Sequence, residues 1–255
     1  MKTPHFVVGT VSLAVLMLCL SSSLLAEEQH APHWSYEGEE GPEHWGELSE
    51  DFLICSEGWN QSPINLVNDV HANLPELKFE YYSSPVDEIN NGHSIQQNIK
   101  PGSFVRIPER GLSYELKQFH FHSPSEHTVD GKSFAMEIHF VHSDENGELA
   151  VVGVLIDEGE EHPVLSQLWT FMPENPGDTN QKPIGIEETN LLPPTREYYA
   201  YSGSLTTPPC TEGVSWVVLK TPIHASAEQI ATFKNRVGQA TNRPVQPIHA
   251  RMILD

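Results

Sequence analysis

The sequence predicts one sheet-dominated domain of the α+β class, for three reasons. Short runs of alternating apolar and polar residues are separated by Gly and Pro between residues 74 and 107. Only residues 163–171 and 226–237 have the character of helices. The chain has 255 residues and no composition shift that would mark a boundary between domains. One large domain can therefore bury a sizeable core.

The expected strands follow one another along most of the chain. Before them, residues 27–50 are predicted to be irregular and anchored by aromatic side chains. A turn at residues 90–93 is expected to present His93 at the start of a strand. The run at 149–156 is apolar on both faces, which indicates a central buried strand. The strand-like runs are 77–82, 94–99, 103–107, 116–122, 134–141, 149–156, 198–201, 214–219 and 242–253.

Two segments carry signals for helices. Pro163 stands where the first turn of a short helix tolerates a proline. Ser226 and Gln229 have the spacing of a capping box, which marks the start of a second helix. Ile230 and Phe233 then share one face of that helix. Residues 173–185, rich in Pro, Gly and Asn, are predicted to form a loop.

The run at 116–122 places two histidines on one side of a strand. His120 and His122 are two positions apart, so their side chains point to the same face. Strict alternation adds Leu116 and Gln118 to this face. The strand therefore has one face that carries imidazoles.

The run at 134–141 repeats the pattern with one histidine. Ala135, Glu137, His139 and Val141 are expected on one face, and the opposite face is apolar, with Phe134, Met136, Ile138 and Phe140. Asp130-Gly131 lies between the two runs and is a strong hairpin signal. Antiparallel pairing of the two strands would bring three imidazoles together.

Three neutral imidazoles with an open fourth position are typical of a catalytic zinc site. Gln118 and Glu137 each stand two positions before a histidine on the same face, where they can orient the ligands. A structural zinc site would need a fourth protein ligand. The alternative is that these are ordinary strand histidines without a metal.

Charge restricts the classes of partner. The formal net charge is −21, with 14 Lys and Arg against 35 Asp and Glu. Such a surface argues against binding to nucleic acid or to anionic lipid.

The first 26 residues resemble a secretory signal in their organisation. A charged start at Lys2 precedes an apolar run at 6–20, and small residues lead to Ala26. We expect cleavage after Ala26, export to the periplasm or the extracellular space, and a mature domain at 27–255 without a membrane anchor. An uncleaved anchor would need a longer apolar run. A lipoprotein signal at Cys19 would need a small residue before the cysteine.

Cleavage would remove Cys19 and leave Cys55 and Cys210. An exported protein with two cysteines usually pairs them. Two buried free thiols are the alternative.

Seven motifs in order resemble the α-class carbonic anhydrases. Ser123-Pro124 follows the second histidine, at a place where animal cytosolic members have Trp-Gly. In this respect the chain is similar to the exported bacterial branch of the family. The motifs are Gly41-Pro-Glu-His-Trp, Gln61-Ser-Pro-Ile, Gln118-Phe-His-Phe-His, Ser125-Glu-His-Thr-Val-Asp-Gly, Met136-Glu-Ile-His, Ser204-Leu-Thr-Thr-Pro-Pro and Arg243-Pro-Val-Gln-Pro. The resemblance implies a large, twisted, mostly antiparallel sheet of roughly ten strands with a few short peripheral helices.

The resemblance also implies roles for individual residues. One Zn2+ per chain would be bound by His120, His122 and His139, and Gln118 and Glu137 would hydrogen-bond these ligands. Thr206 would accept a hydrogen bond from zinc-bound hydroxide and Glu126 would accept one from Thr206, while His93 would be the proton shuttle. Val141, Val151 and Leu205 match the apolar pocket for carbon dioxide, with Thr207 beside the substrate, and Tyr36, Asn91 and Gln96 match residues that line the cavity. Cys55 and Cys210 match a disulfide of exported members. Trp216 is expected to belong both to the core and to the wall of the pocket.

The implied reaction is the reversible hydration of carbon dioxide to bicarbonate and a proton. Zinc-bound hydroxide would attack the substrate, because three neutral ligands leave the zinc charge available to lower the pKa of water to about 7. Inhibition by anions and sulfonamides follows from the family, and a homodimer follows by analogy with exported relatives. The alternative is a non-catalytic carbonic-anhydrase-like domain that binds a partner or sequesters zinc. Loss of a ligand histidine would favour that alternative, and all three are present.

Overall fold

The computed structural model describes residues 32–82, 84–85, 87–180 and 185–255. The helices in this part of the chain are short: α1 (Trp45–Leu48), α2 (Ile54–Glu57), α3 (Pro163–Trp169) and α4 (Ala227–Val237). Four 3-10 turns accompany them: η1 (Gly38–Glu40), η2 (Glu50–Phe52), η3 (Pro108–Arg110) and η4 (Glu188–Leu191). Among the described residues, no helix has the length and apolar character needed to cross a membrane. The predicted signal at residues 1–26 lies outside the described residues.

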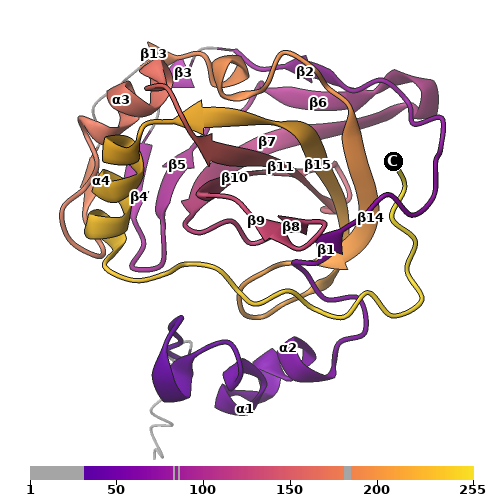
Figure 1. The fold of residues 1–255 in the computed structure, drawn as a ribbon, viewed down its shortest axis with the longest axis horizontal. Helices are drawn as coiled ribbons and strands as arrows, with labels where there is room; N and C mark the ends of the chain where they lie inside the picture. Colours follow the sequence, from indigo (N-terminus) through magenta and orange to yellow (C-terminus); the bar gives the residue numbers. More distant parts are fainter. Residues whose placement is uncertain (1–31, 83, 86, 181–184) are drawn as a thin grey trace, which may run out of the picture. The chain divides into compact units, whose positions relative to one another are not determined.

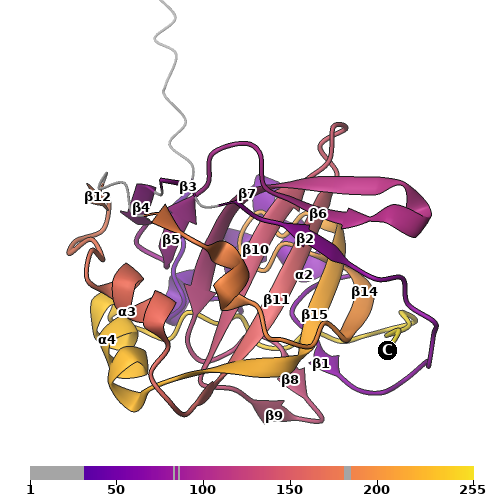
Figure 2. The same ribbon diagram turned by 90° about the horizontal axis from the view of Figure 1, so that it is seen from above.

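A ten-stranded sheet dominates the described chain, as Figures 1 and 2 show. Its main path runs β12-β4-β5-β7-β10-β11-β15-β14, and β6 pairs with β7 and β2. The pairs are antiparallel except for β11 with β15, which is parallel. The predicted fold class is confirmed. The strands are β2 (Lys78–Glu80), β4 (Asp87–Asn90), β5 (Ile95–Asn98), β6 (Phe104–Ile107), β7 (Leu112–His122), β10 (Met136–Ser143), β11 (Leu149–Glu158), β12 (Thr179–Asn180), β14 (Tyr198–Ser204) and β15 (Glu212–Ala225).

The Asp130-Gly131 turn belongs to a smaller hairpin than expected. It joins β8 (Thr128–Val129) to β9 (Lys132–Ser133), and both turn residues have positive φ, 49° and 79°. β8 also pairs in parallel with β1 (Asn65–Leu66). The long strands β7 and β10 are nevertheless antiparallel neighbours, as predicted. A further two-stranded sheet joins β3 (Ser84–Pro85) and β13 (Gly185–Ile186).

A β-bulge in β7 corrects the predicted position of Leu116. The register against β10 shifts between Val141 and His142, which pair with Gln118 and Leu116 respectively. Lys117 is therefore the extra residue, and such a residue breaks the alternation of faces. Leu116 is fully buried in the core cluster that contains Phe119, so it does not share the face of the histidines.

The alternation in the second histidine strand begins later than predicted. Phe134 and Ala135 precede β10, which starts at Met136. Phe134 packs against the cluster of Val151 and Trp216, and Ala135 packs against the opposite cluster. Their expected faces are exchanged because the chain between β9 and β10 is not extended strand.

The C-terminal segment is not the strand that its composition suggested. Residues 242–253 form no strand, and two isolated bridges join the following Leu254 to Val70 and to Ala200. Pro244 and Pro247 lack the N–H groups that a sheet ladder requires. Figure 1 shows the segment leaving α4 as irregular chain and passing β8, β9 and β1. Its backbone bonds to other parts of the chain instead, for example from Gln246 N–H to Pro63 O at 2.7 Å.

The two faces of the sheet belong to two hydrophobic clusters. Val152 and Phe119 belong to the larger one, which also receives α3 and α4 through Leu168 and Phe233. Val151, which alternates with Val152 on β11, belongs to the other cluster. Helix α4 begins with the predicted capping box, in which Ser226 and Gln229 bond each other's backbone.

Candidate metal centre

Strands β7 and β10 bring three imidazoles together. His139 lies directly opposite His120 in the antiparallel register, and His122 follows two residues further along β7. The ring centroids are 5.4 Å apart for His120 and His139, 5.0 Å for His120 and His122, and 4.5 Å for His122 and His139. One nitrogen from each ring lies within 4.8 Å of the other two. The predicted convergence is therefore present.

Each imidazole uses one nitrogen for a hydrogen bond. His120 Nδ1 donates to Gln118 Oε1 at 2.8 Å, and His139 Nε2 donates to Glu137 Oε1 at 2.9 Å. These are the two partners that the sequence predicted for these rings. The bonds fix which nitrogen carries the proton and leave His120 Nε2 and His139 Nδ1 with free lone pairs.

The third imidazole has a main-chain partner that the sequence did not reveal. His122 Nδ1 donates to the carbonyl oxygen of Thr241 at 2.5 Å. His122 Nε2 is buried and has no hydrogen-bond partner among the described residues. A buried nitrogen without a partner is costly unless it binds something, so this atom fits a metal ion. No side-chain pattern could have indicated Thr241, because every residue carries a carbonyl.

The imidazoles are neutral near pH 7, which is the state that ligates a metal. Burial lowers the pKa of His122 to about 4. Burial, together with the two neighbouring rings, lowers the pKa of His120 well below its ordinary value. Burial also lowers the pKa of His139, although Glu137 opposes that effect. Within the described part of the chain, the group consists of three histidines without a fourth side chain, which matches the donor set of catalytic zinc.

Glu137 is the centre of a buried hydrogen-bond network. Its Oε2 accepts the backbone N–H groups of Glu126 and His127 at 2.9 and 2.8 Å. Its Oε1 accepts from His127 Nδ1 at 2.7 Å, in addition to His139. Burial would raise the pKa of Glu137, but His127, His139 and these bonds hold it well below its ordinary value. A permanent carboxylate therefore orients His139.

The network extends beyond Glu137 to the edge strand β14. His127 Nε2 bonds the Tyr201 hydroxyl at 2.7 Å, and that hydroxyl also bonds Ser62 Oγ at 2.9 Å. His127 is fully buried. The sequence did not predict that His127 hydrogen-bonds Glu137, the carboxylate that orients His139.

Glu126 lies next to the free imidazole nitrogens. Its Oε2 is 3.6 Å from His122 Nε2 and 3.8 Å from His139 Nδ1. Burial raises the pKa of Glu126 to about 7, while His139, the Arg243 N–H and a hydrogen bond with Thr206 lower it. Thr206 itself is 5% exposed, in the loop that follows β14. The predicted pair of Glu126 and Thr206 is therefore in contact beside the three histidines.

Arg243 is a supporting residue that the sequence analysis placed only within a family motif. Its backbone N–H donates to Glu126 Oε1 at 2.8 Å. Its buried guanidinium donates to Gln61 Oε1 and Ser62 O at 2.8 Å, and to Cys55 O at 2.6 Å. Arg243 thus connects the chain segment before β1 to the carboxylate of Glu126.

The predicted apolar residues form a row on the histidine face. Val141 is opposite Val151, and Val151 is opposite Trp216, on the successive strands β10, β11 and β15. The Trp216 ring lies 4.9 Å from the His139 ring, and Leu205 packs against the same cluster. The neighbouring Thr207 is partly exposed in the loop after β14.

His93 is held by a turn and by an aromatic stack. Its backbone N–H donates to Asn91 Oδ1 at 2.9 Å. Its ring stacks on Trp34, with centroids 3.6 Å apart and planes 9° apart, and the Tyr36 ring meets it edge-on. Burial lowers the pKa of His93, and His33 lowers it further.

The other two predicted cavity residues connect this turn to the metal strands. Gln96 on β5 lies opposite His120 on β7. Asn91 Nδ2 donates to Gln96 Oε1 at 3.5 Å. The turn of His93 and the strand of His120 therefore share a hydrogen-bonded neighbour.

Cys55 and Cys210 are joined by a disulfide with Cα atoms 5.0 Å apart. The bond lies in a small cluster with Tyr36, Trp45 and Phe52. It ties α2 to the loop that carries Thr206. The expected pairing is thus present in the structure.

Comparison with known proteins agrees with this geometry. Residues 40–255 match the family model of the eukaryotic-type carbonic anhydrases. A carbonic anhydrase from Neisseria gonorrhoeae is 45% identical over 247 residues, which cover 96% of each chain. An α-carbonic anhydrase from Thermovibrio ammonificans, solved with the inhibitor sulfanilamide, has a TM-score of 0.86 at 46% identity over 89% of this chain and 100% of that one. A hyperthermostable carbonic anhydrase from a hydrothermal vent chimney has a TM-score of 0.84 at 48% identity over 87% of this chain and 99% of that one.

The motifs, the ten-stranded sheet and the three converging imidazoles all agree with these relatives. The chain belongs to the α-class carbonic anhydrases and is an enzyme that catalyses the reversible hydration of carbon dioxide.

Proposed function

We propose that this carbonic anhydrase works with one Zn2+ per chain, held by His120 Nε2, His122 Nε2 and His139 Nδ1. One observation supports the proposal: these three nitrogens face one another, while the second nitrogen of each ring is hydrogen-bonded to the protein. Bound zinc supplies a positive charge that makes hydroxide available near neutral pH. Gln118, the Thr241 carbonyl and Glu137 keep the three rings in place.

Thr206 and Glu126 are proposed to orient the nucleophile. The contact between their side chains supports this role, since a threonine hydroxyl that donates to Glu126 has its oxygen free to accept a hydrogen bond. Thr206 would in this way accept a hydrogen bond from the nucleophile and orient it towards the substrate. Thr207, the next residue in the loop, is proposed to lie beside that substrate.

Carbon dioxide is uncharged and linear, so it needs an apolar surface rather than a strong ligand. Val141, Val151 and Trp216 offer such a surface next to His139, and Leu205 extends it. Weak contacts of this kind hold the substrate without slowing the release of product.

His93 is proposed to carry the product proton to solvent, with Tyr36, Asn91 and Gln96 along the route. Its side chain is partly exposed, which gives the ring access to water for proton exchange. The histidine pKa is suited to such transfer near neutral pH. The lowered pKa of His93 favours release of the proton over its retention.

Export is proposed from the signal-like sequence at residues 1–26. The disulfide of Cys55 and Cys210 supports an oxidising compartment, such as the periplasm or the extracellular space. Inhibition by anions and by sulfonamides is proposed for the same metal position, in line with the sulfanilamide complex of the Thermovibrio relative. Homodimer formation stays a prediction from analogy.

Stopped-flow hydration of carbon dioxide tests the proposal, with zinc-loaded and chelated protein compared. We expect full activity with zinc and none after its complete removal. His120→Ala should lose both zinc and activity, while the surface variant His71→Ala should keep both. Activity that survives complete zinc removal would overturn the proposed metal role.

His93→Ala tests the proton route separately. Turnover should fall mainly in weak buffer, because strong buffer can accept the proton directly, and added imidazole should restore the rate. A rate without any dependence on buffer would overturn the role of His93.

A further inference from the structure

A second cavity lies on the other side of the main sheet from the histidines. Its volume is about 460 Å3, which is within the range of small-molecule sites. Val152 lines it and alternates along β11 with Val151, which belongs to the metal side. Val217 and Trp216 on β15 also line the cavity. Residues of the segments 74–77 and 250–254 complete the walls.

The walls are mainly apolar and partly preformed. Val105, Tyr114 and Val152 are almost completely buried members of the larger core cluster. Leu112, at the start of β7, is 38% exposed at the rim. Apolar surface that is open to a ligand without rearrangement favours binding of an alkyl or aromatic group.

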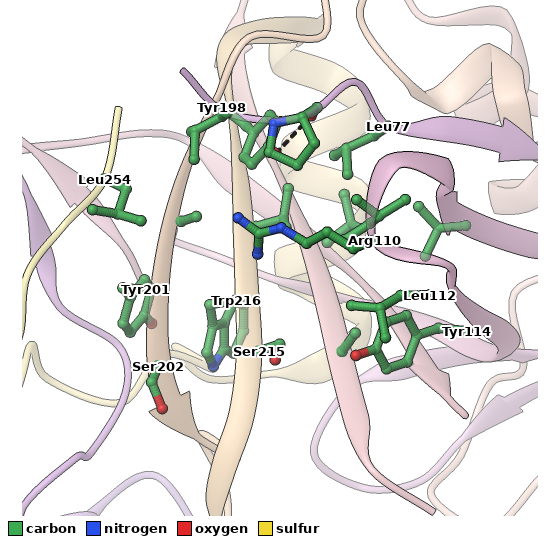
Figure 3. A pocket seen from close by; sticks show the side chains of 18 of the residues that line it. Leu77, Arg110, Leu112, Tyr114, Tyr198, Tyr201, Ser202, Ser215, Trp216 and Leu254 are labelled. Carbon is green, nitrogen blue, oxygen red and sulfur yellow. Dashed lines mark hydrogen bonds between the residues drawn. The ribbon is translucent and has the colours of Figure 1, made fainter. Parts of the chain in front are cut away.

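One basic side chain, the exposed Arg110, extends over this apolar space. Figure 3 shows Arg110 extending from its turn towards β14 and β15. Its guanidinium has no hydrogen bond or ion pair with any residue that the structure describes. The other arginine of the cavity, Arg251, donates to Ile248 O, Ser202 O and Pro247 O, so it belongs to the wall.

The charge around Arg110 favours a ligand with one negative charge. The whole chain is strongly acidic, at −21, and Glu109 precedes Arg110. Tyr198 on the cavity wall is close enough to both residues for their opposite charges to act on its pKa. One unpaired guanidinium beside an acidic neighbour favours a monoanion over a phosphate dianion. A planar carboxylate matches the fork of the guanidinium.

We propose that this cavity binds an amphipathic monocarboxylate. Its carboxylate pairs with Arg110, and its alkyl or aromatic part lies against Val152, Val217 and Leu112. Ser215 also lines the cavity. The site is separate from the residues that ligate the metal.

Isothermal titration of the zinc-loaded enzyme with decanoate tests the proposal. Saturating sulfanilamide is present in every titration, so that a carboxylate cannot occupy the metal position. The wild type should bind decanoate, and Arg110→Gln should weaken binding by about tenfold or more, because a charged hydrogen-bond pair is lost. Ser215→Trp, at an exposed strand position, should abolish binding because the indole fills the cavity.

Two controls separate this site from general attraction to the surface. Arg106→Gln removes a positive charge that already pairs with Glu80. The affinity of this variant for decanoate should therefore equal that of the wild type. Decyltrimethylammonium, with the same chain length and the opposite charge, should bind far more weakly than decanoate. Absence of decanoate binding, equal affinity in Arg110→Gln, or undiminished binding in Ser215→Trp would each overturn the proposal.

Discussion

His139 Nε2 donates to Glu137 Oε1 at 2.9 Å, and this bond turns Nδ1 of the same ring towards His120 and His122. His139 thus offers the opposite nitrogen from the other two rings.

Glu137→Gln should weaken zinc binding by about 10- to 100-fold, because the neutral amide no longer favours the imidazole tautomer with a proton on Nε2. Competition with a fluorescent zinc chelator measures the dissociation constant. Gln118→Ala, which affects only the partner of His120, should produce a smaller loss. An unchanged zinc affinity in Glu137→Gln would show that the carboxylate does not orient the ligand.

Trp34→Ala should raise the pKa of His93 towards its ordinary value. The stacked indole excludes water from the His93 ring, and burial is the main cause of the lowered pKa. Proton NMR of the histidine Cε1–H signal across pH 4–9 follows the titration. Trp59→Ala is the matched control, since that exposed ring stacks on His249 elsewhere. The same His93 pKa in both variants would contradict the explanation.

Glu88→Gln should stabilise the protein at alkaline pH relative to acid pH. Burial raises the pKa of Glu88 to about 7 from an ordinary value of 4.5, although Gln97 and Arg236 lower it. Between these values the folded state binds more protons than the unfolded state, so the wild type loses stability as the pH rises. The advantage of Glu88→Gln in unfolding free energy should therefore grow by about 2–3 kcal/mol between pH 5 and pH 8.

Urea denaturation of the zinc-loaded protein at both pH values measures this change. Asp87→Asn, at the exposed neighbouring position on β4, is the control and should show no comparable growth. A constant difference between Glu88→Gln and wild type would mean that Glu88 is ionised in the folded state at both pH values.

Cys55→Ser should lower stability and leave zinc binding intact. The disulfide joins residues 155 positions apart, and closing so long a loop can contribute on the order of 4–5 kcal/mol at most. Thermal unfolding in oxidising buffer measures the loss, and the wild type under reducing conditions should fall to the level of the variant. An unchanged melting temperature in oxidising buffer would count against a stabilising disulfide.

Much of the metal centre could be predicted because it is built from side chains at fixed spacing along two strands. The two-residue interval between His120 and His122 fixes their common face, and the placement of Gln118 and Glu137 follows the same rule. The Asp130-Gly131 turn correctly indicated antiparallel neighbours, although it closes a smaller hairpin. Helix α4 was also predictable, since its capping box is local.

The features that sequence reasoning missed depend on the backbone or on tertiary packing. The bulge at Lys117 moved Leu116 into the core, and nothing in the local sequence distinguishes a bulge from regular strand there. The Thr241 carbonyl holds His122 without any side-chain signature. Arg243 could be assigned only once its buried hydrogen bonds were known.

Two hydrogen bonds that hold residues of the metal centre come from the C-terminal segment. Thr241 orients His122 and the Arg243 N–H holds Glu126, yet both residues come from the last fifteen of 255. The three histidines are synthesised about a hundred residues earlier. A chain that ends before Thr241 would contain every ligand and still lack the contacts that fix one of them. The metal centre is therefore complete only when the C-terminal segment packs against the sheet.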